Sequence, residues 1–296
     1  MALPSYTTPG QRIWHYSYLS FCAAVLFFLV APLIAVIPLS FTAEPYLQFT
    51  EGMLALDPDA FSLRWYEGLF GMCGDIDSST SVMCTDKWMV GTKNSFIIAI
   101  FATLISTTLG TLAALGLSSP HMPFSRPLMA LMISPMIVPL IITASGLFFF
   151  FAKYNLVATL PGIVLAHAIL GIPFVVITVT ASLAGFDNNL LRAAANLGGP
   201  PITNFFRIQV PMIAPGVISG GLFAFITSFD EVVIVLFIGG PDQYTLPRQM
   251  WSGIRQEISP TILAAATILV ILSILLLGSL EALRRRSEKL RGMSPG

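Results

Sequence analysis

Two adjacent acidic residues, Asp230 and Glu231, interrupt an otherwise apolar stretch of the sequence. A carboxylate at membrane depth costs about 2.5–3.5 kcal/mol on insertion scales, so it usually faces a wet cavity or a partner group. On a continuous helix Thr227 neighbours both acids, and Phe223 extends the same stripe. The pattern predicts a polar wall that can neutralise a cation. The alternative is that one acid lies at the water interface while the other bonds a neighbouring helix.

Two prolines and a histidine are the other unusual residues within apolar sequence. Pro135 and Pro139 break a helical hydrogen-bond ladder, and freed carbonyls are tolerated where they line a cavity or meet neighbouring helices. A kink with only a packing role is the commoner explanation for such prolines. His167 is a candidate proton relay, although a hydrogen-bonded packing histidine is the simpler interpretation. The histidines and cysteines are too scattered to form a metal site.

These residues lie in a chain whose composition places it in a membrane. Hydrophobic residues make up 55% of the 296 residues and charged residues only 10%, whereas soluble domains carry about 25% charged residues. Each of six windows free of Asp, Glu, Lys and Arg is long enough to span the hydrocarbon core. We predict an all-α polytopic protein, and the zero net charge argues against a nucleic-acid partner. The six predicted transmembrane helices are 19–41, 94–117, 127–151, 156–184, 212–238 and 261–283.

The distribution of Lys and Arg predicts the orientation of these helices. Six crossings put both termini on one side, and if that side is the cytoplasm, the inside segments hold nine basic residues against six outside. Arg284-Arg285-Arg286 directly follows the last span and is the strongest anchor. We therefore expect both termini in the cytoplasm. The predicted divisions are a cytoplasmic segment 1–18, transmembrane helix 19–41, a periplasmic loop 42–93, a core 94–283 with the other five helices, and a basic cytoplasmic tail 284–296.

Two cysteines, Cys73 and Cys84, fall in the long outside loop. An oxidising outer compartment allows them to form a disulfide that closes a short loop. The alternative is a pair of free thiols.

The sequence lacks the motifs of an enzyme that hydrolyses its own nucleotide. A phosphate-binding loop needs Gly-Lys followed by Ser or Thr, and none of the four lysines follows a glycine. The sequence also contains neither H-E-x-x-H nor G-x-S-x-G. If the protein drives transport, its energy comes from a partner.

A short helix is predicted in the inside loop 185–210. Asp187, Asn188 or Asn189 can cap its start, and Gly198-Gly199-Pro200-Pro201 is a strong stop. The small side chains in its middle leave room for another surface to approach, although a plain connector is the alternative. The predicted contact residues are Leu190, Leu191, Arg192, Ala193, Ala194, Ala195, Asn196, Leu197 and Gly198.

This loop resembles the "EAA" loop of ABC importer permeases. Arg192-Ala193-Ala194 with Leu197-Gly198, followed by Val210-Pro211 and Pro215-Gly216, is similar to the family pattern E-A-A-x-x-L-G…L-P-x-x-x-P-G. Arg192 stands where the family has Glu, which reverses the charge at that position. Further segments resemble the polyamine (spermidine/putrescine) branch of the family, namely 61–69, Asn94-Ser95, 110–114, 225–231, 239–241 and 245–247.

The resemblance implies a type I ABC importer permease fold, in which the 189–198 helix couples to a cytoplasmic ATPase. It also implies a second permease subunit, homologous but not necessarily identical, two ATPase subunits that bind ATP and Mg, a periplasmic solute-binding protein, and a chain that itself binds no cofactor. The expected solute is a polyamine, with an opine, an aminophosphonate or another small polar solute as the alternative. The expected substrate path consists of Thr227, Ser228, Asp230, Glu231, Phe223, Pro135 and Pro139.

Two other classes of protein are compatible with the residues alone. A stand-alone ion-coupled carrier would use Asp230, Glu231 and His167 as proton sites and would need no ATPase. A receptor-like membrane scaffold would survive loss of the 189–198 helix.

Overall fold

The computed structural model describes residues 7–72, 87–256 and 258–290, and Cys73 and Cys84 lie outside them. The chain divides into two compact units, one formed by its first 84 residues with 257–268, the other by 85–256 with 269–296. The described residues form helices and one isolated bridge, so the all-α prediction is confirmed for them.

The first unit begins with the long helix α1 (Pro9–Leu39). A capping box between Thr8 and Gln11 stabilises the start of this helix. No residue of α1 is buried, as expected of a helix whose apolar surface meets lipid or another subunit. The elements that follow are α2 (Glu51–Leu54), the 3₁₀ turn η1 (Pro58–Ala60) and α3 (Arg64–Leu69). The Trp65 indole N–H donates to the Thr42 carbonyl over 2.7 Å, which ties α3 to the end of α1.

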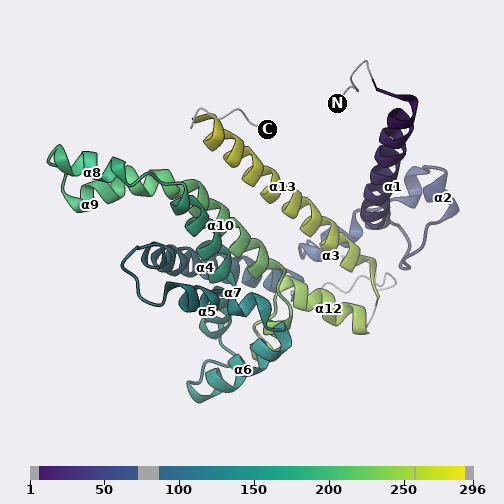
Figure 1. Cartoon of the computed structure of the whole chain (residues 1–296). Coiled ribbons are helices and arrows are strands. Elements are labelled where there is room, and N and C mark those ends of the chain that lie inside the picture. The colour runs from purple at the N-terminus through teal and green to yellow at the C-terminus, as the bar shows by residue number, and fades with distance from the viewer. Residues whose placement is uncertain (1–6, 73–86, 257, 291–296) are drawn as a thin grey trace. The chain divides into compact units, whose positions relative to one another are not determined.

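The second unit contains most of the remaining helices (Figure 1). They are α4 (Lys87–Leu117), α5 (Ser125–Ile137), α6 (Leu140–Lys153), α7 (Leu160–Ala184), α8 (Asn189–Asn196), α9 (Pro201–Asn204), the π-helical turn η2 (Phe205–Gln209), α10 (Val210–Asp230), α11 (Val233–Ile238) and α12 (Leu246–Gln256). The last helix, α13 (Pro260–Leu290), begins in the first unit and continues into the second.

Helices α4, α7 and α10 pack against one another and form the centre of the second unit. Glycines let their backbones approach closely, as is usual between membrane helices. A Cβ atom added at Gly171 of α7 would lie 2.5 Å from the Ser106 hydroxyl oxygen of α4 and 2.9 Å from the Ala224 Cβ of α10. The Ser106 hydroxyl also donates to the Ala168 carbonyl over 2.9 Å. The three helices therefore meet in one tightly packed block.

Among the described residues five helices are long and apolar enough to cross a membrane, and a sixth crossing is present if α5 and α6 count as one span. The third predicted span, 127–151, is not one kinked helix, because α5 and α6 meet at 103°. Pro139 has no N–H to continue the ladder, and the residue before a proline is pushed out of the helical region. Accordingly Val138 is extended, with φ −71° and ψ 134°.

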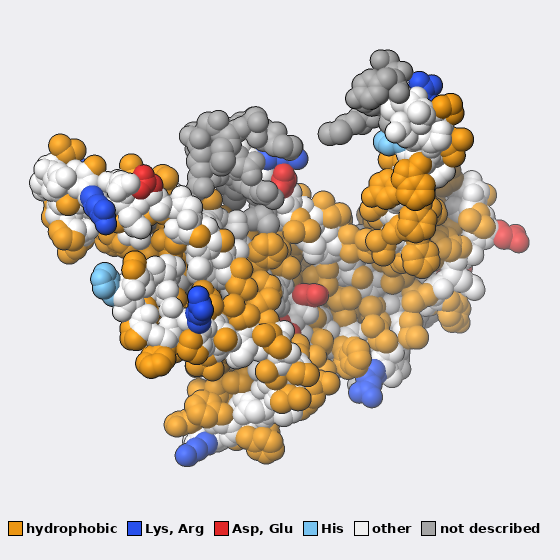
Figure 2. Space-filling model, in the orientation of Figure 1, with side chains coloured by type: hydrophobic (Ala, Val, Ile, Leu, Met, Phe, Trp, Pro, Cys, Tyr) orange, Lys and Arg blue, Asp and Glu red, His pale blue; other side chains and the backbone are white. Residues whose placement is uncertain are grey.

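The fifth predicted span, 212–238, is also interrupted. Helix α10 ends at Asp230, Glu231 is extended, and α11 starts again at Val233. Hydrophobic side chains cover much of the face seen in Figure 2, as is usual for a protein that lies in a membrane.

Candidate functional site

Helix α8 and its flanking turns form the first candidate site. The Asp187 carboxylate accepts the Asn189 N–H over 2.9 Å, so Asp187 caps the start of the helix. At the other end Gly198 has φ +81°, a conformation that favours glycine, and the Gly199 N–H donates to the Ala194 carbonyl over 3.0 Å. Local sequence signals thus determine both ends of α8.

The turn from α8 to α9 is held by Asn204, a buried residue. Its side-chain amide donates to the Gly199 carbonyl over 3.0 Å. A Cβ atom at Gly199 would lie 2.4 Å from the Asn204 side-chain oxygen, so only glycine fits there without a shift. Helix α9, η2 and α10 follow without a loop. The chain therefore runs from α9 to the central helix α10 as continuous helical backbone.

Large apolar side chains are exposed around α8. Leu197 is 89% exposed, Ile202 74% and Phe206 63%. Arg192 is also exposed, and the ion pair found among the described residues does not involve it. Figure 1 shows α8 and α9 projecting at one end of α10. An exposed apolar surface of this kind marks a contact with another protein or with the membrane.

A cavity of about 390 Å³ forms the second candidate site. It lies where α5 gives way to α6, beside α7 and the end of α10. It brings together Pro135, Pro139, Thr227 and Glu231, all four predicted for the substrate path. The other lining residues are Met136, Ile137, Val138, Leu140, Leu170 and Phe174.

Glu231 is the charged residue of this cavity and is only 8% exposed. Its Oε1 atom accepts the Ile234 N–H over 3.0 Å, so the carboxylate also caps the start of α11. The expectation that Thr227 and Glu231 share a face of one continuous helix is wrong, because α10 ends before Glu231. Both residues nevertheless line the same cavity.

The remaining residues of the predicted path lie elsewhere. Ser228 is buried, its hydroxyl oxygen is 2.9 Å from His167 Nδ1, and it does not line the cavity. Asp230 is exposed and does not line it either. Phe223 stacks on the cavity residue Phe174 with ring centroids 6.1 Å apart. His167 of α7 is therefore a buried histidine that is hydrogen-bonded to α10.

Sequence reasoning missed a set of contacts that fixes the loop between α11 and α12. The Asn94 side-chain amide donates to the carbonyls of Asp242 (3.2 Å) and Tyr244 (2.9 Å). The Leu246 N–H donates to the Ser95 hydroxyl oxygen over 2.8 Å. Asn94-Ser95 and the segments around 240 and 246 each carry the family resemblance, and that shared resemblance was the signal that could have linked them.

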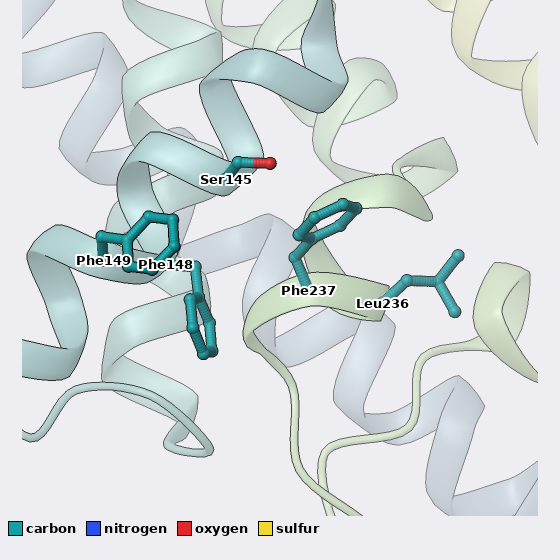
Figure 3. A pocket seen from close by; sticks show the side chains of 5 residues that line it. All are labelled: Ser145, Phe148, Phe149, Leu236 and Phe237. Atoms are coloured by element: carbon teal, nitrogen blue, oxygen red, sulfur yellow. The ribbon is translucent and has the colours of Figure 1, made fainter.

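A second cavity of about 430 Å³ lies between α6 and α11. Figure 3 shows the side chains that line it. Helix α6 contributes Ser145, Phe148 and Phe149, and α11 contributes Leu236 and Phe237. This lining carries no charged group, so we assign it no role in recognising a polar solute.

The described part of the chain is helical, has five or six apolar crossings and holds a cavity with a buried acid at a break between membrane helices, as a multi-pass membrane protein does. The chain belongs to the family of binding-protein-dependent transport system inner membrane components, whose pattern matches residues 106–289. It is therefore a permease subunit in an inner membrane, as predicted.

The relatives agree with this assignment. The chain is 28% identical over 269 residues to the spermidine/putrescine transport system permease protein PotC of Haemophilus influenzae, covering 91% of this chain and 96% of that protein. It is 30% identical over 250 residues to the putrescine transport system permease protein PotI of Escherichia coli K12, covering 82% of each. The fold is similar to a bacterial ABC transporter that imports alginate, with TM-score 0.66, 12% identity, and 94% and 99% of the two chains covered.

Proposed function

We propose that this subunit forms half of the path of an ATP-driven importer and that the imported solute is a polyamine. The observation that carries the proposal is the exposed apolar surface that follows α8 and consists of Leu197, Ile202 of α9 and Phe206 of η2. Such side chains are stable in an aqueous compartment when a partner covers them. The partner is a cytoplasmic ATPase that binds ATP and Mg²⁺, whereas this chain binds neither.

The rest of the assembly follows from the proposed mechanism. One subunit does not enclose a path, so a second, homologous permease pairs with it, and a periplasmic solute-binding protein delivers the solute. Both termini and α8 lie in the cytoplasm. Closure of two ATPase subunits on ATP displaces α8, and the continuous backbone through η2 transmits this movement to α10 and rocks the spans between inward- and outward-open states.

Two observations support a polyamine as the solute. The two relatives described above carry the names of spermidine and putrescine permeases. In addition, the cavity has a buried acid, which suits a solute that carries a cationic group. A stand-alone carrier gains no support, because the family works with binding proteins. In addition His167, the proton site of such a carrier, is hydrogen-bonded to Ser228.

The test is to replace Leu197 by Asp in the full importer complex. Because Leu197 is 89% exposed, the substitution leaves the isolated subunit as stable as before to within about 0.5 kcal/mol. We expect the ATPase to be lost on purification and solute-stimulated ATP hydrolysis to fall at least tenfold. The control is Leu54→Asp, because Leu54 lies in the first unit and is 74% exposed. This variant should keep both the bound ATPase and solute-stimulated ATP hydrolysis. Full ATPase association in the Leu197→Asp variant would contradict the proposal.

A further inference from the structure

We infer that His167 of α7 is a positioning residue of the transport path, because its ring holds the carbonyl end of α10 beside the α10–α11 break. The inference rests on the proposed function and deepens it. His167 does not line the cavity, so its task is to fix the backbone that carries the cavity residues.

The break leaves backbone carbonyls without partners. Helix α10 ends at Asp230 and Glu231 is extended, so the last four carbonyls of α10 have no N–H donor within the helix. In the hydrocarbon region of a membrane no water supplies the missing donors, and such groups must be satisfied within the protein. The Ser228 carbonyl is one of these four and therefore needs a donor from outside α10.

His167 supplies that donor. Its Nδ1 atom lies 3.1 Å from the Ser228 carbonyl oxygen and 2.9 Å from the Ser228 hydroxyl oxygen. A carbonyl oxygen only accepts hydrogen bonds, so this contact requires the proton on Nδ1. His167 is 1% exposed, and its Nε2 atom has no hydrogen-bond partner in the described part of the chain. The ring therefore acts through one nitrogen, and that nitrogen contacts the backbone of α10.

One face of α7 joins this contact to the cavity. Phe174, which lines the cavity, follows His167 by seven residues and so lies on the same side of α7. On the partner strand of backbone, Thr227 directly precedes Ser228, and Glu231 follows it by three residues. Both Thr227 and Glu231 line the cavity. A hydrogen bond that fixes Ser228 to α7 therefore fixes the backbone between two cavity residues.

The other side of the break is capped as well. The Glu231 carboxylate accepts the Ile234 N–H at the start of α11 over 3.0 Å. Side chains thus satisfy a carbonyl of the ending helix and an N–H group of the starting one. A helix end that loses such a partner opens locally. Removal of the His167 donor should therefore loosen the last turn of α10 and leave the block of α4, α7 and α10 packed.

Three substitutions of His167 test the inference, because they separate the donor from the volume of the ring. His167→Asn keeps an N–H donor near the position of Nδ1, His167→Gln moves the amide outward to about the position of Nε2, and His167→Leu fills the space without a donor. The control is His121→Gln, which replaces an exposed histidine between α4 and α5. All variants are assembled with the ATPase, the second permease and the solute-binding protein in nanodiscs.

We expect His167→Leu and His167→Gln to lower ATP hydrolysis stimulated by 1,4-diaminobutane at least about fivefold, with the ATPase still bound through α8. His167→Asn should retain at least half of the activity, and His121→Gln all of it. Hydrogen exchange at residues 229–234 should become about 5- to 100-fold faster in His167→Leu and His167→Gln, as for loss of a buried hydrogen bond. Exchange at residues 212–220 should stay unchanged.

The position of the ring proton gives a readout that needs no substitution of His167. The subunit contains three histidines, and in a His15→Gln/His121→Gln background His167 is the one that remains. With this subunit alone labelled with ¹⁵N-histidine, nitrogen NMR of the complex should show a ring protonated at Nδ1 and not at Nε2. This measurement decides the case if the His167 variants do not assemble.

Equal activity and equal exchange in His167→Asn and His167→Gln would overturn the inference, because the donor at Nδ1 would then not matter. Full activity of His167→Leu would overturn it too, and so would a ring that carries its proton on Nε2 alone. If the unmodified complex does not respond to the diamine, the proposed solute fails, while hydrogen exchange and the nitrogen spectrum still decide the role of His167.

Discussion

Gly220 lies at a close approach between α10 and α7, and its replacement by alanine should destabilise the protein. The added Cβ atom would lie 2.7 Å from the Val175 Cα and 2.4 Å from the Thr178 hydroxyl oxygen. The hydroxyl can rotate away, but the Cα cannot, so the two helices must separate. Overpacking of this kind costs about 1–3 kcal/mol, and the better helix propensity of alanine returns up to about 1 kcal/mol.

With the full helix-propensity gain subtracted, the expected net effect of Gly220→Ala is a loss of about 0–2 kcal/mol in the free energy of unfolding, measured by titration with denaturing detergent. The matched control is Gly116→Ala in α4, where an added Cβ atom meets no atom within 4 Å. That variant should be unchanged or stabilised by up to about 1 kcal/mol. If Gly220→Ala proves as stable as Gly116→Ala, the close packing of α7 and α10 described here is wrong.

Two further substitutions test α8 and the α11–α12 loop. Arg192→Glu should leave the stability of the subunit within about 0.5 kcal/mol and lower transport-coupled ATP hydrolysis at least tenfold, because we expect the ATPase groove to complement a cation; unchanged coupling would remove Arg192 from the mechanism. Asn94→Ala should cost about 1–3 kcal/mol for the two hydrogen bonds to the carbonyls of Asp242 and Tyr244. Hydrogen exchange at residues 240–246 should become faster in that variant, and an unchanged exchange rate would show that Asn94 does not hold the loop.

The helices and α8 could be predicted because their causes are local. A membrane span needs a run of apolar residues without charges, and the sequence displays these runs directly. Helix α8 lies between a capping Asp187 and the Gly198-Gly199 stop, both of which act within a few residues. The charge reversal at Arg192 was likewise visible from the sequence.

The breaks in the helices were harder to foresee. Pro135 and Pro139 predicted a disturbed hydrogen-bond ladder but not the 103° angle between α5 and α6, nor the packing of α6 against α11, a helix distant in sequence. The end of α10 at Asp230 has no glycine or proline to mark it, since Glu231-Val232 is an ordinary dipeptide. For that reason the position of Glu231 was inferred from a continuous helix, and Ser228 was placed in the path although it faces His167.

Site-specific cross-linking from α8 in the assembled importer tests the central claim most directly. Ala195 is exposed, so Ala195→Cys in a background without reactive cysteines offers a probe on the free surface of the helix. The account predicts that a short bifunctional reagent joins this cysteine to the nucleotide-binding subunit, with a yield that changes when ATP is added. A cysteine that stays fully open to a bulky water-soluble maleimide in the intact complex, and that forms no such adduct, would contradict it.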